Sequence, residues 1–264
     1  MNLQFLNSRK IINIIEIASQ IILQIYHRDN FGIEIKQDKS PLTEADKKAN
    51  EYICSQLTIL YPDIPIISEE NKNADYNVRS KYKYAWLIDP LDGTKEFINK
   101  NGEFTVNIGL IYFGVPVAGF VNIPCSEITY WSIKDCGAWK KNYNEDDSFM
   151  IERSDSYDGR RLQKGKTIVL ASRSHMNDET VQYIEKLGEV ELKNVGSSIK
   201  LMWIAENKAD VYPRIAPTME WDTCASDAIL RELGGGCMMY GNENEYLIYN
   251  KESLLNPSFI ARLH

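Results

Sequence analysis

The chain has 264 residues, of which 44% are hydrophobic and 25% charged, and its formal net charge is −7. This length and composition predict a soluble globular protein of one large or two modest domains. The acidic balance argues against nucleic-acid binding, which needs a basic surface, although a metal or a local basic cluster would still allow an anionic substrate.

The cysteines and the apolar stretches bear on the location of the protein. The five cysteines lack any C-x-x-C pair, which favours free thiols in a reducing cytoplasm and disfavours a zinc site. Polar residues interrupt the isoleucine-rich stretch after Arg9-Lys10, so a signal peptide is not expected. Residues 104–126 are uncharged but rich in Gly and Pro, which favours a buried hairpin over a membrane span. We expect a cytoplasmic protein without an integral membrane segment. Peripheral attachment to the inner membrane and the oligomeric state stay open.

The first half of the chain predicts two helices and then a strand-rich region. A stripe of isoleucines predicts a helix over about 3–28, followed by a short strand at 32–36. Ser40-Pro41-Leu42 is expected to be a turn. Thr43 and Asp46 resemble a capping box that opens a helix to about residue 60. Further strands are expected at 64–68, 84–88, 105–112, 115–123, 128–132 and 138–141.

The pattern changes after residue 142. Residues 142–164 are polar and charged, and are expected to form a linker or an irregular excursion. Beyond them, strands and helices alternate, which suggests a layered α/β unit. The strands are expected at 167–171, 189–193 and 209–212, and the helices at about 178–187, 197–207 and 222–233. We therefore expect an α/β protein in which an α+β metal-binding unit (1–160) is completed by an α/β unit (161–264).

One predicted strand runs straight into Asp89 and Asp92, three residues apart. Open sheets place their ligand sites at this carboxyl edge. Two carboxylates this close repel each other unless they are protonated or bridged by a cation, and oxygen ligands select Mg²⁺ or Mn²⁺. Gly93 lets the backbone approach an anion, and the amides of Gly93 and Thr94 open the next helix. An Asx-turn followed by a helix cap explains the same residues without a metal, and stays open.

Acidic residues follow two other expected elements. Glu69 and Glu70 end a strand, where they are alternatively plain solvated charges. Asp222 stands at a helix start, where an N-cap is the alternative. Taken together, the three acidic termini predict a pair of metals that clamp the attacking and leaving oxygens in phosphate hydrolysis. The acids of the first pair are not two apart as in D-x-D-G-T phosphatases, so a covalent aspartyl intermediate is not expected.

Several segments together resemble the lithium-sensitive, magnesium-dependent inositol monophosphatase superfamily. They are LTEAD, ISEE, DPLDGTKEF and EWD. The longer run WLIDPLDGTKEFINKNGEFTVNIGLI, with ASRSH, VGSSIK, ADVYPR and LLNPSF, is closer to one branch, the bacterial CysQ-type 3′(2′),5′-bisphosphate nucleotidases. The match covers nearly the whole chain in collinear order. One departure is Cys224-Ala225-Ser226, where the family tends to have Ala-Ala-Gly, and it bears on the packing of that helix start.

The resemblance implies an alternating α-β-α-β-α layered fold and a metal-dependent phosphatase. The expected cofactor is two or three Mg²⁺ ions, with Mn²⁺ as a substitute and Li⁺ and Ca²⁺ as inhibitors. Glu69, Asp89 and the backbone carbonyl of Leu91 would hold one ion. Asp89, Asp92 and Asp222 would hold a second.

The resemblance also implies how water is activated. Glu69, with Thr94 and Asp46 behind it, would position and activate the attacking water. The Thr94 hydroxyl needs a partner to steer its proton, and Asp46 is the expected acceptor. Pure helix capping is the alternative role for Asp46, although the two roles can coexist.

The substrate implied is a small bisphosphate nucleotide such as 3′-phosphoadenosine 5′-phosphate. Its uncleaved phosphate needs positive charge or amide donors. The residues implied to contact the substrate are Glu69, Leu91, Asp92, Gly93, Thr94, His175, Ser197, Lys200, Arg214 and Asp222. Ser197 and Ser198 are expected to cap a helix after Gly196. Solvated surface charges and a loop histidine remain the simple alternatives for Lys200, Arg214 and His175.

The expected activity is removal of the 3′ phosphate to give AMP, in support of sulfate assimilation. An inositol or sugar monophosphatase on the same scaffold is the alternative enzyme. A non-catalytic nucleotide- or metal-binding protein is the alternative from another class. VGSSIK and Arg214 favour the nucleotide branch, and the presence of Thr94 with all the expected acids favours catalysis.

Overall fold

The computed structural model describes residues 3–28, 32–35, 41–143, 148–151, 166–171 and 176–264. The helices are α1 (Ser8–Tyr26), α2 (Glu44–Leu60), α3 (Tyr76–Arg79), α4 (Thr94–Ile98), α6 (Asp178–Glu185), α7 (Ile199–Ala205) and α8 (Glu220–Glu232), with a 3₁₀ turn at Pro124–Ser126. The strands of the first half are β1 (Ile33–Ile35), β2 (Pro41–Thr43), β3 (Ile66–Ser68), β4 (Tyr84–Asp92), β5 (Thr105–Tyr112), β6 (Val115–Ile123), β7 (Ile128–Ile133), β8 (Ala138–Asn142) and β9 (Phe149–Met150). Those of the second half are β10 (Thr167–Ala171), β11 (Val190–Asn194), β12 (Tyr212–Arg214), β13 (Gly236–Met239), β14 (Asn242–Tyr246) and β15 (Phe259–Arg262).

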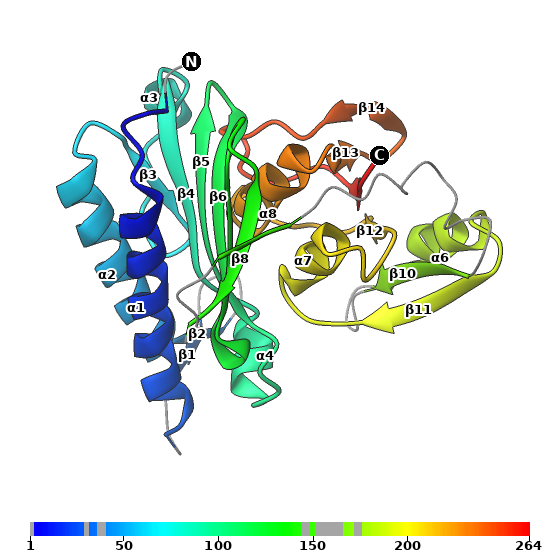
Figure 1. The fold of residues 1–264 in the computed structure, drawn as a ribbon, viewed down its shortest axis with the longest axis horizontal. Coiled ribbons are helices and arrows are strands. Elements are labelled where there is room, and N and C mark those ends of the chain that lie inside the picture. The colour runs from blue at the N-terminus through cyan, green and yellow to red at the C-terminus, as the bar shows by residue number, and fades with distance from the viewer. Residues whose placement is uncertain (1–2, 29–31, 36–40, 144–147, 152–165, 172–175) are drawn as a thin grey trace.

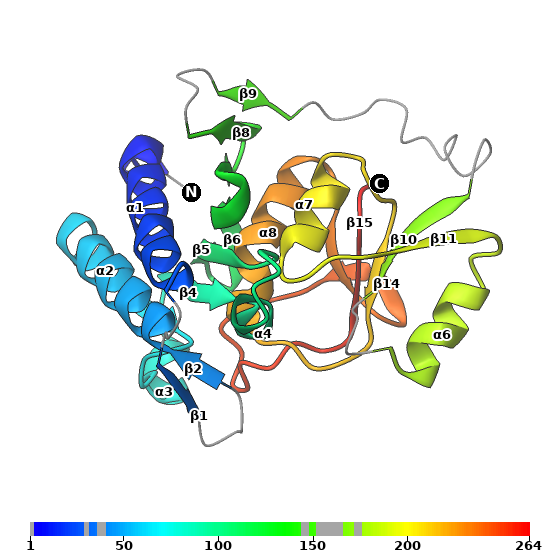
Figure 2. The ribbon, with the colours of Figure 1, turned by 90° about the horizontal axis from the view of Figure 1, so that it is seen from below.

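Layers of helices and strands alternate across the molecule (Figure 1). α1 and α2 cover one face of the sheet β3-β4-β5-β6-β7-β8-β9, and α8 covers the other. Beyond α7 and α8 lie the sheet β12-β15-β13-β14 and the pair β10-β11, with α6 outermost (Figures 1 and 2). The expected alternating α-β-α-β-α fold is therefore confirmed.

The first layer forms as the isoleucine pattern predicts. The apolar stripe of α1 faces inward, and Ile11, Ile15 and Ile22 are fully buried. The side chain of Asn7 caps this helix by accepting a hydrogen bond from the Lys10 backbone N–H at 3.1 Å. The uncharged stretch near residues 104–126 forms the buried hairpin β5-β6. No helix in the described part of the chain has the length and apolar character needed to cross a membrane.

The central sheet is antiparallel except at one edge. β3 pairs with β4 in parallel, while each later strand pairs antiparallel with the one before it. The parallel pair brings the carboxyl ends of β3 and β4 to the same edge. This edge carries the acids that the sequence singles out.

The two halves of the chain share a hydrophobic core. Leu87 and Val121 from the central sheet belong to the same buried cluster as Leu170, Ile229 and Phe259 from the second half. The division expected at residue 160 falls within residues 152–165, outside the described residues, and it stays a prediction.

Several expected local features differ from the structure. Pro41 and Leu42 form strand β2 and pair with β1, so the expected turn there is wrong. The strand expected at 209–212 lies slightly later, at Tyr212–Arg214. Within the expected excursion at 142–164, Phe149–Met150 extends the central sheet as β9. The last three strands were not expected, because β13 begins among glycines and β14 is a run of polar residues.

Two glycines let α8 pack directly on the central sheet. A Cβ atom at Gly119 would come within 1.9 Å of the Ala225 carbonyl oxygen. At Gly109 it would come within 2.6 Å of the Cys224 Sγ atom. The departure at Cys224 is thus accommodated by a glycine on the facing strand, and the thiol is fully buried.

Replacing Gly119 with alanine should destabilise the fold strongly. The new methyl group would overlap main-chain atoms of α8, which cannot rotate away as a side chain can. We expect a loss of about 3 kcal/mol or more in the free energy of unfolding, at the high end of overpacking effects. Urea unfolding followed by circular dichroism measures it.

Gly188→Ala is the control, because a Cβ atom there meets nothing within 4 Å. Its positive φ of 81° should cost about 1–2 kcal/mol. Equal losses for the two variants would contradict the close approach of α8 to β6.

Candidate active site

A bulge at the end of β4 sets the spacing of the first two acids. The strand does not end at residue 88 but continues to Asp92. Asp89 lies opposite Asn107 and Asp92 lies opposite Thr105, so three steps on β4 match two on β5. Such a bulge redirects side chains at the rim of a sheet. Asp89 is thereby buried, while Asp92 faces a cavity.

Two neighbours complete the acidic cluster. Glu69 directly follows β3, and its backbone N–H donates to the Ile88 carbonyl oxygen at 3.1 Å. Asp222 lies in the first turn of α8, and its Oδ2 accepts a hydrogen bond from the Met219 N–H at 2.9 Å. Asp222 is therefore not the N-cap residue of its alternative role, which is Met219, but it bonds back to that residue from the third helical position. Its second carboxylate oxygen is left for another partner.

Burial and mutual repulsion disfavour the charged form of these acids. The pKa of Asp89 is raised well above its usual value, mainly by burial and then by the charges of Glu69, Asp92 and Asp222. The pKa of Asp222 is raised by removal from solvent and then by Asp92. A cation among these carboxylates would offset both effects.

The donor set suits a hard divalent cation, although its oxygens do not yet converge. Among the described residues, no three acidic, histidine or cysteine side chains come together as a metal site. Asp92 Oδ2 instead accepts hydrogen bonds from Ser197 Oγ at 2.6 Å and from the Ser198 N–H at 2.7 Å. Asp89 Oδ1 accepts one from the Leu91 N–H at 3.1 Å, which is the expected Asx-turn. The all-oxygen chemistry of these residues fits Mg²⁺.

Thr94 and Asp46 meet behind the acidic cluster. Asp46 Oδ2 accepts hydrogen bonds from the Thr43 N–H at 2.7 Å and from the Thr43 hydroxyl at 2.5 Å, so the capping box is present. The Thr94 hydroxyl lies 3.4 Å from Asp46 Oδ1 and 3.4 Å from the Leu91 carbonyl oxygen. With a single hydrogen, it donates to one of them at a time. One carboxylate oxygen thus caps α2 while the other faces Thr94.

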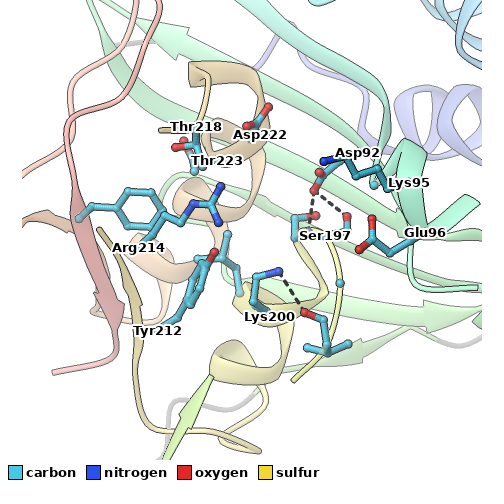
Figure 3. A pocket seen from close by; sticks show the side chains of 16 residues that line it. Asp92, Lys95, Glu96, Ser197, Lys200, Tyr212, Arg214, Thr218, Asp222 and Thr223 are labelled. Atoms are coloured by element: carbon cyan, nitrogen blue, oxygen red, sulfur yellow. Dashed lines mark hydrogen bonds between the residues drawn. The ribbon is translucent and has the colours of Figure 1, made fainter. Parts of the chain in front are cut away.

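A cavity of about 140 Å³ lies beside the acids (Figure 3). It is lined by Asp92, Gly93, Lys95, Glu96, Val195, Gly196, Ser197, Ser198, Lys200, Leu201, Tyr212, Arg214, Thr218, Asp222, Thr223 and Phe259. The structure therefore brings Asp92, Gly93, Ser197, Lys200, Arg214 and Asp222 together, as expected. His175 lies outside the described residues, so its role stays a prediction.

Lys200 is not a surface charge, whereas Arg214 is half-buried. The Lys200 side chain is buried, and its Nζ donates to the Val195 carbonyl oxygen at 3.1 Å. Burial lowers the pKa of Lys200 to about 8. Arg214 donates from Nη2 to the Pro217 carbonyl oxygen at 2.9 Å, whereas its buried Nε has no partner in the described part of the chain. Figure 3 shows both cations pointing into the cavity.

Ser198 occupies the N-cap position of α7, as expected, but the Ser197 and Ser198 side chains do not cap the helix. The helix begins at Ile199, and the hydroxyl groups turn instead toward the central sheet. Ser197 Oγ lies 2.6 Å from Thr105 Oγ1, and Ser198 Oγ donates to Asn107 Oδ1 at 2.8 Å. Hydroxyl groups that bond to side chains of the buried strand β5 are not available to cap the helix.

Sequence reasoning missed several residues of the site. Lys95, Glu96 and Tyr212 line the cavity, although Lys95 and Glu96 directly follow the DGT motif and gave a signal by position. The pKa of Glu96 is raised, mainly by burial.

Asn256, in the LLNPSF segment, holds the entry to α8. Its Nδ2 contacts the Met219 carbonyl oxygen at 2.8 Å and Thr223 Oγ1 at 2.9 Å. Its backbone N–H donates to the Thr218 carbonyl oxygen at 2.8 Å. These bonds fix the turn that carries Asp222.

Comparison with known proteins agrees with this architecture. The model of the Inositol monophosphatase family matches residues 8–263. The 3′(2′),5′-bisphosphate nucleotidase CysQ of Salmonella typhimurium is 39% identical over 249 residues, covering 94% of this chain and 96% of that protein. The crystal structure of CysQ from Bacteroides thetaiotaomicron is 42% identical, with a TM-score of 0.83 and 99% of each chain covered.

A more distant structure bears on the fold alone. It is an IMPase/NADP phosphatase complexed with Mg²⁺ and phosphate, 19% identical, with a TM-score of 0.74 and coverage of 92% of this chain and 85% of that chain. The family match over nearly the whole length, together with the acidic cluster and its neighbouring cavity, leads to one conclusion: this chain belongs to the inositol monophosphatase family.

Proposed function

We propose that this chain is a Mg²⁺-dependent 3′(2′),5′-bisphosphate nucleotidase that converts 3′-phosphoadenosine 5′-phosphate into AMP and phosphate. The observation that carries the proposal is the cavity in which Lys200 and Arg214 adjoin the carboxylates Asp92 and Asp222. A monophosphatase needs one anion site, whereas this arrangement offers a second. The relatives named as nucleotidases support the same activity. Clearance of this by-product would support sulfate assimilation.

The acidic cluster would hold the metal ions. Glu69, Asp89 and the Leu91 carbonyl oxygen would bind one Mg²⁺, and Asp89, Asp92 and Asp222 a second. When bound, the ions supply positive charge that stabilises the phosphate oxygens and favours ionisation of the attacking water. Mn²⁺ is expected to substitute, and Li⁺ and Ca²⁺ to inhibit.

Thr94 and Asp46 would orient the attacking water. When the Thr94 hydroxyl donates its hydrogen to Asp46 Oδ1, its lone pairs are free to accept one from water. Thr43 holds the other Asp46 oxygen, which fixes the carboxylate in place. Glu69 would then accept the single proton that this water loses as it attacks, while the other hydrogen of the water bonds to Thr94.

Lys200, Arg214 and Ser197 would hold the uncleaved 5′ phosphate. The buried Arg214 Nε lacks a partner within the described residues, and an anion would satisfy it. The cavity of about 140 Å³ is smaller than sites that enclose drug-sized ligands, which are roughly 300–1,000 Å³. We therefore expect it to enclose the ribose and phosphate and to leave the base at its mouth.

Replacing Asp89 with asparagine should abolish turnover while the fold survives. The change removes the charge shared by both metal sites at the edge of the sheet. We expect kcat to fall on the order of 10²-fold or more. The measurement is kcat at saturating Mg²⁺, with circular dichroism as the check on folding. A variant within about threefold of the parent would exclude the two-metal assignment.

Replacing Glu69 with glutamine should separate water activation from metal binding. The amide keeps an oxygen ligand but cannot accept the proton, so we expect kcat to fall on the order of 10²-fold or more. Weak Mg²⁺ binding should persist at Asp89, Asp92 and Asp222, measured by calorimetry. The neighbouring Glu70→Gln is the matched control. An unchanged kcat in the Glu69 variant would move the role to another residue, with Glu70 the next candidate.

Replacing Lys200 with methionine should slow hydrolysis of the bisphosphate substrate and leave hydrolysis of a monophosphate nearly unchanged. One charge-assisted hydrogen bond contributes roughly 1.5–3 kcal/mol to binding, so its loss should lower kcat/KM by about 10- to 150-fold. Hydrolysis of inositol 1-phosphate, which has no second phosphate, should barely change. In the parent protein, kcat/KM for the bisphosphate should also fall as pH rises through about 8, because Lys200 then loses its charge.

The exposed Lys186→Met serves as the control for removing a lysine charge. Equal losses on both substrates would show that Lys200 supports the fold or the reacting phosphate. Unchanged rates on both would remove the main local support for the nucleotide assignment.

A further inference from the structure

Glu96 is a carboxylate inside a cavity that we have assigned to phosphate groups. It belongs to the first turn of α4, is partly buried and lines the cavity together with Lys200 and Arg214. Figure 3 shows Glu96 on the α4 side, across from Arg214 and Tyr212. Within the described part of the chain, Glu96 forms no ion pair that would neutralise it.

Glu96 packs closely against the loop at Gly196. A Cβ atom at Gly196 would lie 2.8 Å from Glu96 Cγ and 2.7 Å from the Glu103 carbonyl oxygen, so a larger residue at Gly196 would displace both. The Gly196 N–H donates to Glu103 Oε2 at 2.8 Å, which anchors the loop against α4. The Glu96 Cγ atom thus lies close to the loop that precedes Lys200.

The charge of Glu96 interacts with both Asp92 and Lys200. It lines the same cavity as Asp92, proposed to hold a metal ion at the reacting phosphate, and Lys200, proposed to hold the 5′ phosphate. A phosphate beside this carboxylate would be repelled. An ionised carboxylate only accepts hydrogen bonds, so its partner on the substrate must be a neutral donor.

The ribose is the part of the substrate that spans the two phosphates. It carries one free hydroxyl, next to the carbon that bears the scissile phosphate. We propose that Glu96 accepts a hydrogen bond from this hydroxyl and so selects ribonucleotide over deoxyribonucleotide bisphosphates. The inference rests on the proposed function and adds a specificity residue to it.

The experiment compares 3′-phosphoadenosine 5′-phosphate with its 2′-deoxy counterpart at saturating Mg²⁺. The parent protein should favour the ribose substrate in kcat/KM by about 10- to 150-fold, the range for one hydrogen bond to a charged group. Glu96→Ala should slow the ribose substrate and bring the ratio close to one. Glu96→Gln retains a neutral acceptor and should give an intermediate ratio. Glu51→Ala, which removes an exposed carboxylate from α2, is the matched control and should keep the parent ratio.

Three results would overturn the proposal while leaving the nucleotidase activity intact. The first is a parent protein without preference between the substrates. The second is a Glu96→Ala variant that keeps the parent ratio, because its rates on both substrates are unchanged. The third is a variant that keeps this ratio because it slows both substrates by the same factor. Hydrolysis of neither nucleotide by the parent protein would instead overturn the proposed function, and the role of Glu96 with it.

Discussion

Repulsion among carboxylates that the fold forces together is the interaction on which the site depends. The parallel pairing of β3 and β4 brings Glu69 beside Asp89, and the bulge in β4 adds Asp92. The raised pKa of Asp89 records the cost of this arrangement in the absence of a cation. Such a cost persists only where the surrounding structure supplies the stability. Here the buried central sheet, covered on both faces by helices, supplies it.

The second half of the chain acts on the same acids through main-chain and hydroxyl donors. Ser197 and Ser198 engage Asp92 and at the same time contact Thr105 and Asn107 on β5. Both donors bind the same Asp92 oxygen, Oδ2, so a cation at that oxygen would compete with them. The loop before α7 and the acidic cluster are therefore energetically linked, although they lie about a hundred residues apart in sequence.

Much of this arrangement could be predicted from the sequence, because local patterns specify it. The isoleucine stripe of α1, the capping box at Thr43 and the hairpin β5-β6 depend on neighbouring residues, and the structure contains all three. The acids at the strand ends were also recognisable, although their role as metal ligands stays a prediction.

The features that could not be predicted depend on distant partners. Ser198 directly precedes α7, yet its hydroxyl bonds to Asn107, more than ninety positions away, and no local rule favours that bond over a side-chain cap. Burial of Lys200 depends on Tyr212, whose ring lies 5.3 Å from its amine, and on the fold of the second half. The polar strand β14 forms because β13 offers an edge, since its own sequence has little strand character.

The contact between Gly119 and Ala225 has a consequence for the placement of the site. The main chain of β6 meets the main chain of α8 at this point. The distance between the helix and the sheet is therefore set there by backbone atoms and not by side chains. Cys224 takes part in the same close approach, because its thiol packs against Gly109. The two glycines of the sheet thus set how closely α8 approaches it, and with that the position of Asp222 in the first turn of the helix.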